Sequence, residues 1–509
     1  MTDFPWLTVL ALIPLLGALL VAALPERLEQ VAKQVALGFS LITLAVLIAM
    51  ALQFESGTQG FQFEEVHEWI PQFGVSYALG VDGIALVLIG LATVLTPVCI
   101  LASWHDVDAT RRSVKGYFAL LLLLETFMVG VFAATDVFLF YVLFEAMLVP
   151  MYFIIGSYGG PQRSYAAVKF LLYSLFGGLL MLAAVIGLYV VSDGGPQAFL
   201  FENMLDTDMG TSTERLLFVG FFIAFAIKAP LWPVHTWLPD AAAESPPGGA
   251  VLLVGVLDKV GTFGMIRFCL PLFPDASQWA APVVITLAVI GILYGALLAI
   301  GQTDMKRLIA YTSISHFGFI VLGIFAMTTQ GQSGATLYMV NHGFSTAALF
   351  LIAGFLISRR GSRLIADYGG VQRVAPMLAG TFLVAGLSSL ALPGLSTFVS
   401  EFLVLVGTFT RYEAAAIIAT GGIILASLYI LLMYQRTMTG QPNEHTSKLA
   451  DLDVREAWVV APLIAVIIAL GFFPQPLLDV ISPAVDRTMQ QVGVEDPAPE
   501  VPAAERSVP

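Results

Sequence analysis

Long runs of apolar residues dominate the chain, and short polar stretches separate one run from the next. A helix that spans a membrane needs about 20 mostly apolar residues, and runs of this kind predict fourteen spans in the chain. They cover approximately residues 4–24, 31–52, 80–104, 114–133, 135–156, 166–192, 214–241, 247–270, 277–301, 303–327, 332–358, 374–410, 411–436 and 455–474. The pattern therefore predicts an all-α polytopic membrane protein.

The composition agrees with this fold class. Of the 509 residues, 58% are hydrophobic and only 12% are charged, whereas soluble domains carry about 25% charged residues. The net charge of −13 comes mostly from loops and the C-terminal end, so it says little about nucleic acid, and no nucleic-acid partner is expected. Cys99 and Cys269 form no CxxC pair and both fall in predicted spans. We therefore expect no disulfide and no zinc or iron–sulfur site.

Lysine and arginine are distributed unevenly over the predicted loops. If the N-terminus is external, sixteen of the 23 basic residues fall in cytoplasmic loops, as the positive-inside rule requires. Five lie in external loops or the tail: Arg215, Arg267, Arg411, Arg487 and Arg506. The remaining two, Lys228 and Lys259, fall within spans. This distribution supports fourteen helices with both termini outside, and residues 4–24, which lack a basic leader and a cleavage site, as a retained first helix.

Two of the predicted spans are too long to be single straight helices. Residues 374–410 would measure about 55 Å as one helix, against a hydrocarbon core of about 30 Å, and they contain Pro393 and Gly394. Residues 214–241 contain Pro230 and Pro233. Matching interruptions point to repeats with a site between them. We therefore predict broken helices 7 and 12 in two inverted five-helix repeats, helices 4–8 and 9–13.

The repeats divide the chain into five parts. Residues 1–113 hold helices 1–3 and an acidic external loop at 53–79, which is expected to form a small ordered cap with Asp82 capping the third helix. The first repeat covers 114–270 and the second 277–436, and residues 437–474 hold a loop and helix 14. Residues 475–509, rich in Pro, Ala and Glu towards their end, are predicted to be an external disordered tail.

Seven ionisable residues fall inside the predicted spans, although a charge at the bilayer centre costs roughly 2.5–3.5 kcal/mol on insertion scales. They are Glu125, Glu145, Lys228, Lys259, His316, His342 and Glu401. Any one of them could be a structural group with a satisfied hydrogen bond, and this alternative is strongest for Glu125. Seven together favour a proton relay, for which acids, lysines and histidines are the usual components.

Five stretches of the chain carry a resemblance to a known family. They are FYVLFEAMLVPMYF, KAPLWPVHTWLPDA, GVLDKVGTFGMIRF, TDMKRLIAYTSISHFGFI and LPGLSTFVSEF. Together they resemble the subunit M, or chain-4, family of the bacterial proton-pumping NADH:quinone oxidoreductase (complex I), over roughly residues 1–475. The resemblance implies a translocase subunit in the plasma membrane, driven by redox chemistry elsewhere in the complex.

The resemblance also implies roles for individual residues. Glu145 and Lys228 would form the charge pair of the first repeat, and Lys259 would be the central lysine of helix 8. His316 would lie in the connection on helix 10, and Glu401 would be the terminal acid on helix 12. Weaker candidates for the relay are His342, His235, Glu125 and Asp258.

The resemblance implies no cofactor and no metal in this chain. FMN and iron–sulfur clusters are expected in other subunits, and quinone would bind elsewhere. The expected partners are other membrane subunits, especially sibling antiporter-like subunits, and the lipid bilayer.

The sequence departs from the family pattern at two positions. Ala242 stands where many members have a histidine, and Asp258 precedes Lys259 where an apolar residue is common. Asp258 could face Arg267, a polar neighbour or the proton path, and the sequence leaves these alternatives open.

Two other functions remain as alternatives. One is a subunit of a multi-subunit Na⁺/H⁺ antiporter or membrane hydrogenase, and the other is a stand-alone transporter of a small solute. The FEAMLVPMYF motif and Glu401 favour the complex I subunit over the first, and no set of residues suggests a solute pocket.

Overall fold

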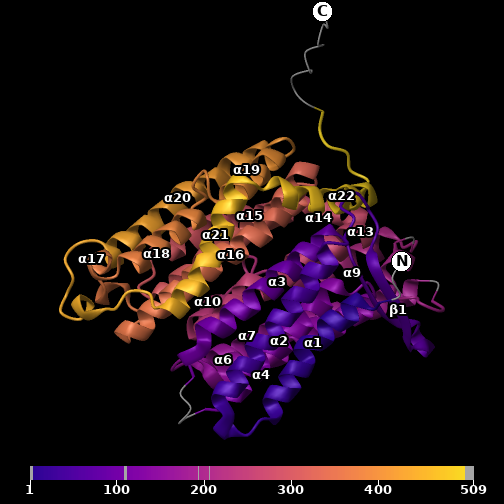
Figure 1. Ribbon diagram of the computed structural model, residues 1–509. Coiled ribbons are helices and arrows are strands. Elements are labelled where there is room, and N and C mark those ends of the chain that lie inside the picture. The colour runs from indigo at the N-terminus through magenta and orange to yellow at the C-terminus, as the bar shows by residue number, and fades with distance from the viewer. Residues whose placement is uncertain (1–3, 108–111, 193, 206, 499–509) are drawn as a thin grey trace, which may run out of the picture.

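Helices make up almost the whole architecture of the computed structural model, which describes residues 4–107, 112–192, 194–205 and 207–498 (Figure 1). Within these residues, twelve helical segments are long and apolar enough to cross a membrane. The first six are α1 (Trp6–Ala23), η1 (Glu26–Leu28) with α2 (Glu29–Ala51), α3 (Gly83–Ala102) with η3 (Ser103–His105), α4 (Val114–Ala133), α5 (Val137–Ala146) with α6 (Leu148–Tyr158), and α7 (Arg163–Val191). The seventh segment is continuous over five short elements: α11 (Pro247–Leu252), η4 (Leu253–Leu257), α12 (Asp258–Gly264), η5 (Met265–Cys269) and α13 (Leu270–Leu272). The last five are α14 (Pro274–Ile300), α15 (Met305–Phe325), α16 (Thr329–Arg360), α20 (Glu413–Met438) and α21 (Val454–Phe472).

The two long spans are broken, as the prolines predicted. In place of helix 7 stand α9 (Thr211–Lys228) and α10 (Trp237–Glu244), and in place of helix 12 stand α18 (Pro376–Ser389) and α19 (Ser396–Phe409). Each interruption frees carbonyl groups that need a new donor. The Trp237 indole donates to the Ile227 carbonyl at 2.9 Å across the first break. The expected order of helices is thus present, while a count of fourteen crossings stays a prediction.

The loop between α2 and α3 contains the one sheet found within the described ranges. Strands β1 (Gln62–Ile70) and β2 (Val75–Val81) pair in antiparallel fashion. Glu65 on β1 accepts the backbone N–H groups of Leu7 and Thr8 at 2.8 and 3.2 Å, which satisfies the start of α1. Asp82 caps α3 as predicted, because its Oδ1 accepts the Ala85 N–H at 2.9 Å.

The prediction of a disordered tail from residue 475 is wrong for its first part. Residues Gln475–Val492 form α22, an amphipathic helix that buries Ile481, Val485 and Met489. It lies along one end of the bundle beside α13 and α14 (Figure 1). Its polar face gave it too little hydropathy to stand out as a helix of the membrane. Residues 499–509 lie outside the described residues.

The remaining described elements are short: η2 (Pro71–Phe73), α8 (Phe201–Met204), η6 (Ile365–Asp367), α17 (Val371–Val374) and η7 (Thr446–Lys448).

The most enclosed helices carry three of the predicted relay residues, Lys259, His316 and His342. The segment from α11 to α13 is completely buried, and α15 and α16 are nearly so, whereas α1, α2 and α21 lie at the periphery. Figure 1 shows the early helices, from indigo to magenta, beside the late helices, from orange to yellow. Lys259 on α12, His316 on α15 and His342 on α16 therefore lie in the interior.

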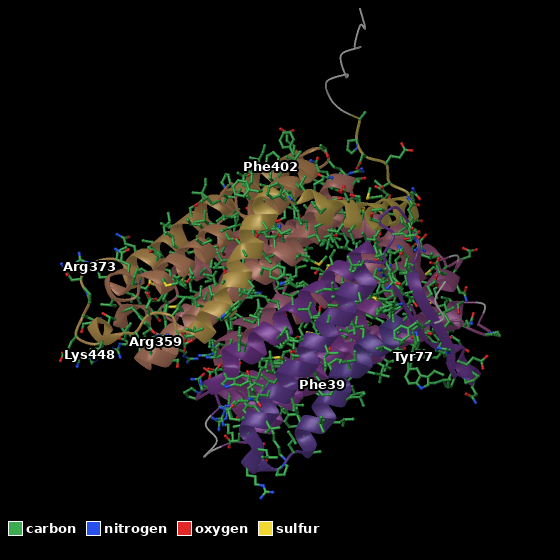
Figure 2. All side chains as sticks on the ribbon, viewed as in Figure 1. Phe39, Tyr77, Arg359, Arg373, Phe402 and Lys448 are labelled. Atoms are coloured by element: carbon green, nitrogen blue, oxygen red, sulfur yellow. The ribbon has the colours of Figure 1, made fainter. Side chains whose placement is uncertain are left out.

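Polar contacts join the two repeats at one end of the bundle. Arg363, after α16, pairs with Glu244 at the end of α10 at 3.0 Å. Arg307 on α15 pairs with Asp240 on α10 at 2.6 Å, and Asp240 also pairs with Lys169 on α7 at 2.7 Å. Figure 2 shows Arg359, Arg373 and Lys448 towards this side of the molecule and Tyr77 of β2 at the opposite side.

Candidate functional site

Lys259 and His342 are in direct contact in the interior of the protein. The Lys259 Nζ lies 2.7 Å from His342 Nδ1 and donates to the Val254 carbonyl at 2.6 Å. The Lys259 side chain is fully buried, and its ammonium lies 5.1 Å from the centre of the Phe317 ring. His342, predicted only as a weaker member, is thus the direct neighbour of the central lysine.

The helix that carries Lys259 is irregular on both sides of it. α12 lies between two π-helical turns, η4 and η5. Such turns disturb the regular hydrogen-bond ladder and occur frequently at functional sites. The Val254 carbonyl that holds Lys259 belongs to the first of these turns. Local backbone irregularity therefore supplies the lysine with a polar contact deep in the protein.

A second hydrogen-bonded series links His316, Tyr338 and Glu401. His316 Nδ1 lies 2.7 Å from the Tyr338 hydroxyl, and this hydroxyl donates to Glu401 Oε2 at 2.8 Å. All three side chains are buried, on α15, α16 and α19 respectively. Since the Tyr338 hydrogen goes to Glu401, the tyrosine oxygen accepts and His316 Nδ1 carries the hydrogen.

Ser389 completes the surroundings of His316. His316 Nε2 lies 3.2 Å from the Ser389 hydroxyl, and with the hydrogen on Nδ1 this nitrogen accepts from the serine. Ser389 is the last residue of α18, directly before the second break. Lys228 likewise ends α9, directly before the first break. Each broken helix thus presents its terminal side chain to the polar interior.

A gap in the hydrogen bonding separates the Lys259–His342 pair from the His316–Tyr338–Glu401 series. The rings of His316 and His342 have their centres 5.2 Å apart, and His342 Nε2 has no hydrogen-bond partner among the described residues. With Lys259 donating to Nδ1, the hydrogen of neutral His342 lies on Nε2. A proton crossing from His342 to His316 therefore needs a ring rotation or a bridging water.

Glu145 and Lys228 do not form a closed ion pair in this structure. The Lys228 Nζ has no hydrogen-bond partner in the described part of the chain, and neither has Glu145 Oε1. The Lys228 ammonium instead lies 4.9 Å from the centre of the Phe144 ring. The charges of Glu145 and Lys228 nevertheless act on each other. The expected pair is therefore present as neighbours but not in contact.

The space around Glu145 depends on a glycine. A Cβ built on Gly178 of α7 would lie 1.8 Å from Glu145 Oε1, so only glycine leaves room for the carboxylate there. Lys228 lies at the C-terminal end of α9, where the helix dipole favours positive charge. The local structure thus accommodates both charges without direct contact between them.

The other candidates are buried but are not all joined to these groups. Both carboxylate oxygens of Glu125 and of Asp258 lack hydrogen-bond partners within the described ranges. His235 lies in the first break, with its ring 5.1 Å from that of Tyr294. Arg267 is not the partner of Asp258, because its Nη2 donates to Asp82 Oδ2 at 2.6 Å.

Tyr338 and Ser389 were not among the residues predicted from the sequence. Tyr338 precedes His342 by four residues on α16, so the two share one face of the helix. This spacing in the sequence could have identified Tyr338 as a neighbour of the predicted relay. Ser389 lies four residues before Pro393, and nothing in its sequence context marked it. No group of three or more His, Cys, Asp or Glu residues in the described segments has the arrangement of a metal site.

A bundle with two broken helices and an interior series of lysine, histidine, tyrosine and glutamate defines an antiporter-like membrane subunit. The family model described as NADH:quinone oxidoreductase/Mrp antiporter, transmembrane, matches residues 134–426. NADH-quinone oxidoreductase subunit M of Mycobacterium tuberculosis is 55% identical, over 98% of this chain and 97% of the relative. The NADH-ubiquinone oxidoreductase chain 4 of Marchantia polymorpha is 38% identical, over 94% and 96%.

Solved structures agree. A chain of respiratory complex I from Thermus thermophilus with bound NADH superposes with a TM-score of 0.87 and 31% identity, covering 96% of this chain and 100% of that one. A chain of the Mrp complex from Dietzia gives a TM-score of 0.85 at 22% identity, over 97% and 100%, a likeness of fold alone. The chain belongs to the NADH:quinone oxidoreductase/Mrp antiporter membrane subunit family.

Proposed function

We propose that the chain is the proton-translocating subunit M of a bacterial NADH:quinone oxidoreductase. The observation that carries the proposal is the buried series from Lys259 through His342 to His316, Tyr338 and Glu401. Acids, bases and a hydroxyl grouped in a membrane interior are the usual components of a proton relay.

The residues divide into two functional groups. Glu145 and Lys228 sense the conformation of the complex through the distance between their charges. Lys259 holds a proton while its charge is favoured, and passes it to His342 when that charge becomes unfavourable. The proton then moves through His316 and the Tyr338 hydroxyl to Glu401. At Tyr338 the incoming proton binds the oxygen as the outgoing one leaves to Glu401.

The chain would work as one part of a larger assembly. Redox chemistry on FMN, iron–sulfur clusters and quinone is assigned to other subunits. Glu145 is only half-buried in the isolated chain, as suits a residue next to a neighbouring membrane subunit. The complex would lie in the bacterial plasma membrane, with the N- and C-termini of this subunit on the external side.

A subunit of a Na⁺/H⁺ antiporter is the second candidate, because the Mrp chain from Dietzia has the same fold. Subunit M and chain 4 proteins match this chain by sequence at 38–55% identity over 94–98% of its length, which favours the redox-driven pump. A requirement for Na⁺ in proton movement would reverse this preference.

The experiment uses the whole complex in inverted membrane vesicles, with NADH-driven proton uptake measured by a pH-sensitive dye at varied Na⁺. Glu401→Gln keeps the shape of the side chain but cannot ionise, so we expect assembly with little proton uptake. Thr408→Val on the same helix is the control, because its hydroxyl donates to the Val404 carbonyl of its own helix at 2.7 Å. Equal uptake in both variants would contradict the proposal.

A further inference from the structure

Asp258 is a buried charged group that the proposed relay leaves unused. Its side chain is completely buried, and both carboxylate oxygens lack a hydrogen-bond partner among the residues described. An unpaired buried charge is costly, and an apolar side chain at this position would avoid the cost. Packing alone therefore does not account for an aspartate at position 258.

The helix geometry places Asp258 towards α9. Gly261, three residues further along α12, shares a face with Asp258. A Cβ on Gly261 would lie 2.5 Å from the Phe225 carbonyl oxygen and 2.6 Å from the Ala229 nitrogen. This face of α12 thus packs directly on the end of α9, where Lys228 is the last residue.

Lys259 points to a different neighbour. Its ammonium reaches His342 on α16, and Thr262 on the adjoining face contacts Met339 of the same helix at 2.9 Å. The charged groups that act on Asp258 are Lys259 and Lys228. The charged groups that act on Lys228 are in turn Glu145 and Asp258.

Two carboxylates, Glu145 and Asp258, therefore act on Lys228, and its ammonium is hydrogen-bonded to neither in this structure. We propose that Asp258 is a counter-ion shared by Lys228 and Lys259, and that Lys228 moves between Glu145 and Asp258. This inference rests on the proposed function and adds a positioning residue to it.

The exchange of partners explains how Lys259 is loaded and emptied. While Lys228 pairs with Glu145, the Asp258 carboxylate is free to stabilise the Lys259 ammonium. When Lys228 pairs with Asp258, the negative charge is neutralised and the Lys259 ammonium loses its counter-ion. The N–H bond of Lys259 then breaks as an N–H bond forms on His342, and no proton is bound by Asp258 at any step.

The test compares Asp258→Asn and Asp258→Glu in the whole complex. The asparagine keeps the volume but not the charge, so we expect normal assembly with at least a tenfold loss of NADH-driven proton uptake. The glutamate restores the charge, so we expect it to recover at least a third of the wild-type rate. Thr96→Val is the matched control, a buried hydroxyl on α3 that donates to the Ala92 carbonyl of its own helix at 2.9 Å.

A second readout is independent of turnover. Redox-induced infrared difference spectra of the complex should contain a carboxylate band that is absent in Asp258→Asn, because a change of counter-ion alters the carboxylate stretch. Wild-type uptake in Asp258→Asn, equal loss in both variants, or an unchanged infrared spectrum would overturn the inference. Glu401→Gln tests the proposed function separately, since a loss there with full uptake in Asp258→Asn contradicts the shared counter-ion alone.

Discussion

Tyr338 donates its hydroxyl hydrogen to Glu401 Oε2 at 2.8 Å, from α16 to α19. The Tyr338 hydroxyl oxygen also lies 2.7 Å from His316 Nδ1, so one neutral side chain joins a base to an acid. A phenol can release one proton as it accepts another, so we expect Tyr338 to pass protons from His316 to Glu401 without holding one itself.

Tyr338→Phe should break this connection with little change in packing. Removing the hydroxyl leaves His316 and Glu401 without a bridge, and losing a positioned proton-transfer group costs roughly 10²–10⁴-fold in rate. We expect coupled NADH:quinone turnover to fall below about a tenth of wild type. Tyr117→Phe is the control, since this buried tyrosine contacts Ser103 at 3.1 Å, away from the relay. Comparable turnover in the two variants would show that Tyr338 only fills space.

Glu145 should be required for its charge and not for its shape. Glu145→Gln should assemble and lose most of the coupled turnover, because Lys228 then lacks one of its two carboxylates. Glu145→Asp should keep part of the activity, and membrane-vesicle assays with subunit immunoblots measure both properties. Wild-type turnover in the glutamine variant at full assembly would return Glu145 to a structural role.

Arginine should be tolerated differently at the two lysine positions. Arginine remains charged at any physiological pH, so Lys228→Arg keeps a positive charge that can change partners, and we expect substantial proton uptake. Lys259→Arg cannot release its proton to His342, and we expect uptake to be almost abolished. Equal tolerance of arginine at both positions would remove the distinction between a charge that modulates and a group that carries.

The orientation of the chain can be tested with reporter fusions. A fusion at Arg360 should report the cytoplasm, while fusions at Gln59 and at Gly493 should report the external side. The last two sites lie at the same end of the bundle, because Arg487 of α22 donates to the Gln59 carbonyl at 3.4 Å. Opposite locations for Gln59 and Gly493 would contradict both this end assignment and the even number of crossings.

Gly83→Ala should destabilise the attachment of α22. A Cβ at Gly83 would lie 1.7 Å from the Val480 carbonyl oxygen, so α22 has to move, at a cost of about 1–3 kcal/mol. We expect a lower unfolding temperature of the detergent-solubilised complex. Gly90→Ala on the same helix is the control, because nothing lies within 4 Å of its added Cβ. An unchanged unfolding temperature for Gly83→Ala would mean that α22 is attached elsewhere.

The sequence predicted the helices well because hydrophobic length and helix-breaking prolines act locally. The breaks after Lys228 and Ser389 follow from Pro230 and Pro393 in this way. α22 was missed because its apolar residues occupy only one face, so its average hydropathy is low. Tyr338 was missed for a related reason: it costs little to insert and carries no charge, so neither hydropathy nor charge marks it.

Contacts between side chains were harder to predict than their presence in the membrane. Glu145 and Lys228 are both present as expected, yet the distance between them depends on rotamers and on the space beside Gly178. His342 was ranked below His316, although their order along the path depends on how α12, α15 and α16 pack. Their roles in proton transfer stay predictions.

Polar contacts connect the two repeats at both ends of the bundle. At one end, Arg363 pairs with Glu244. At the other end, α22 contacts both repeats: Arg487 pairs with Glu202 of the first repeat, and the Val492 carbonyl accepts from Gln278 of the second. Transporters that use alternating access rock one half against the other around a central site. A rocking motion of this kind would break the contacts at both ends in every cycle. We therefore expect the backbone frame to stay in place, with proton movement carried by local rearrangement of side chains.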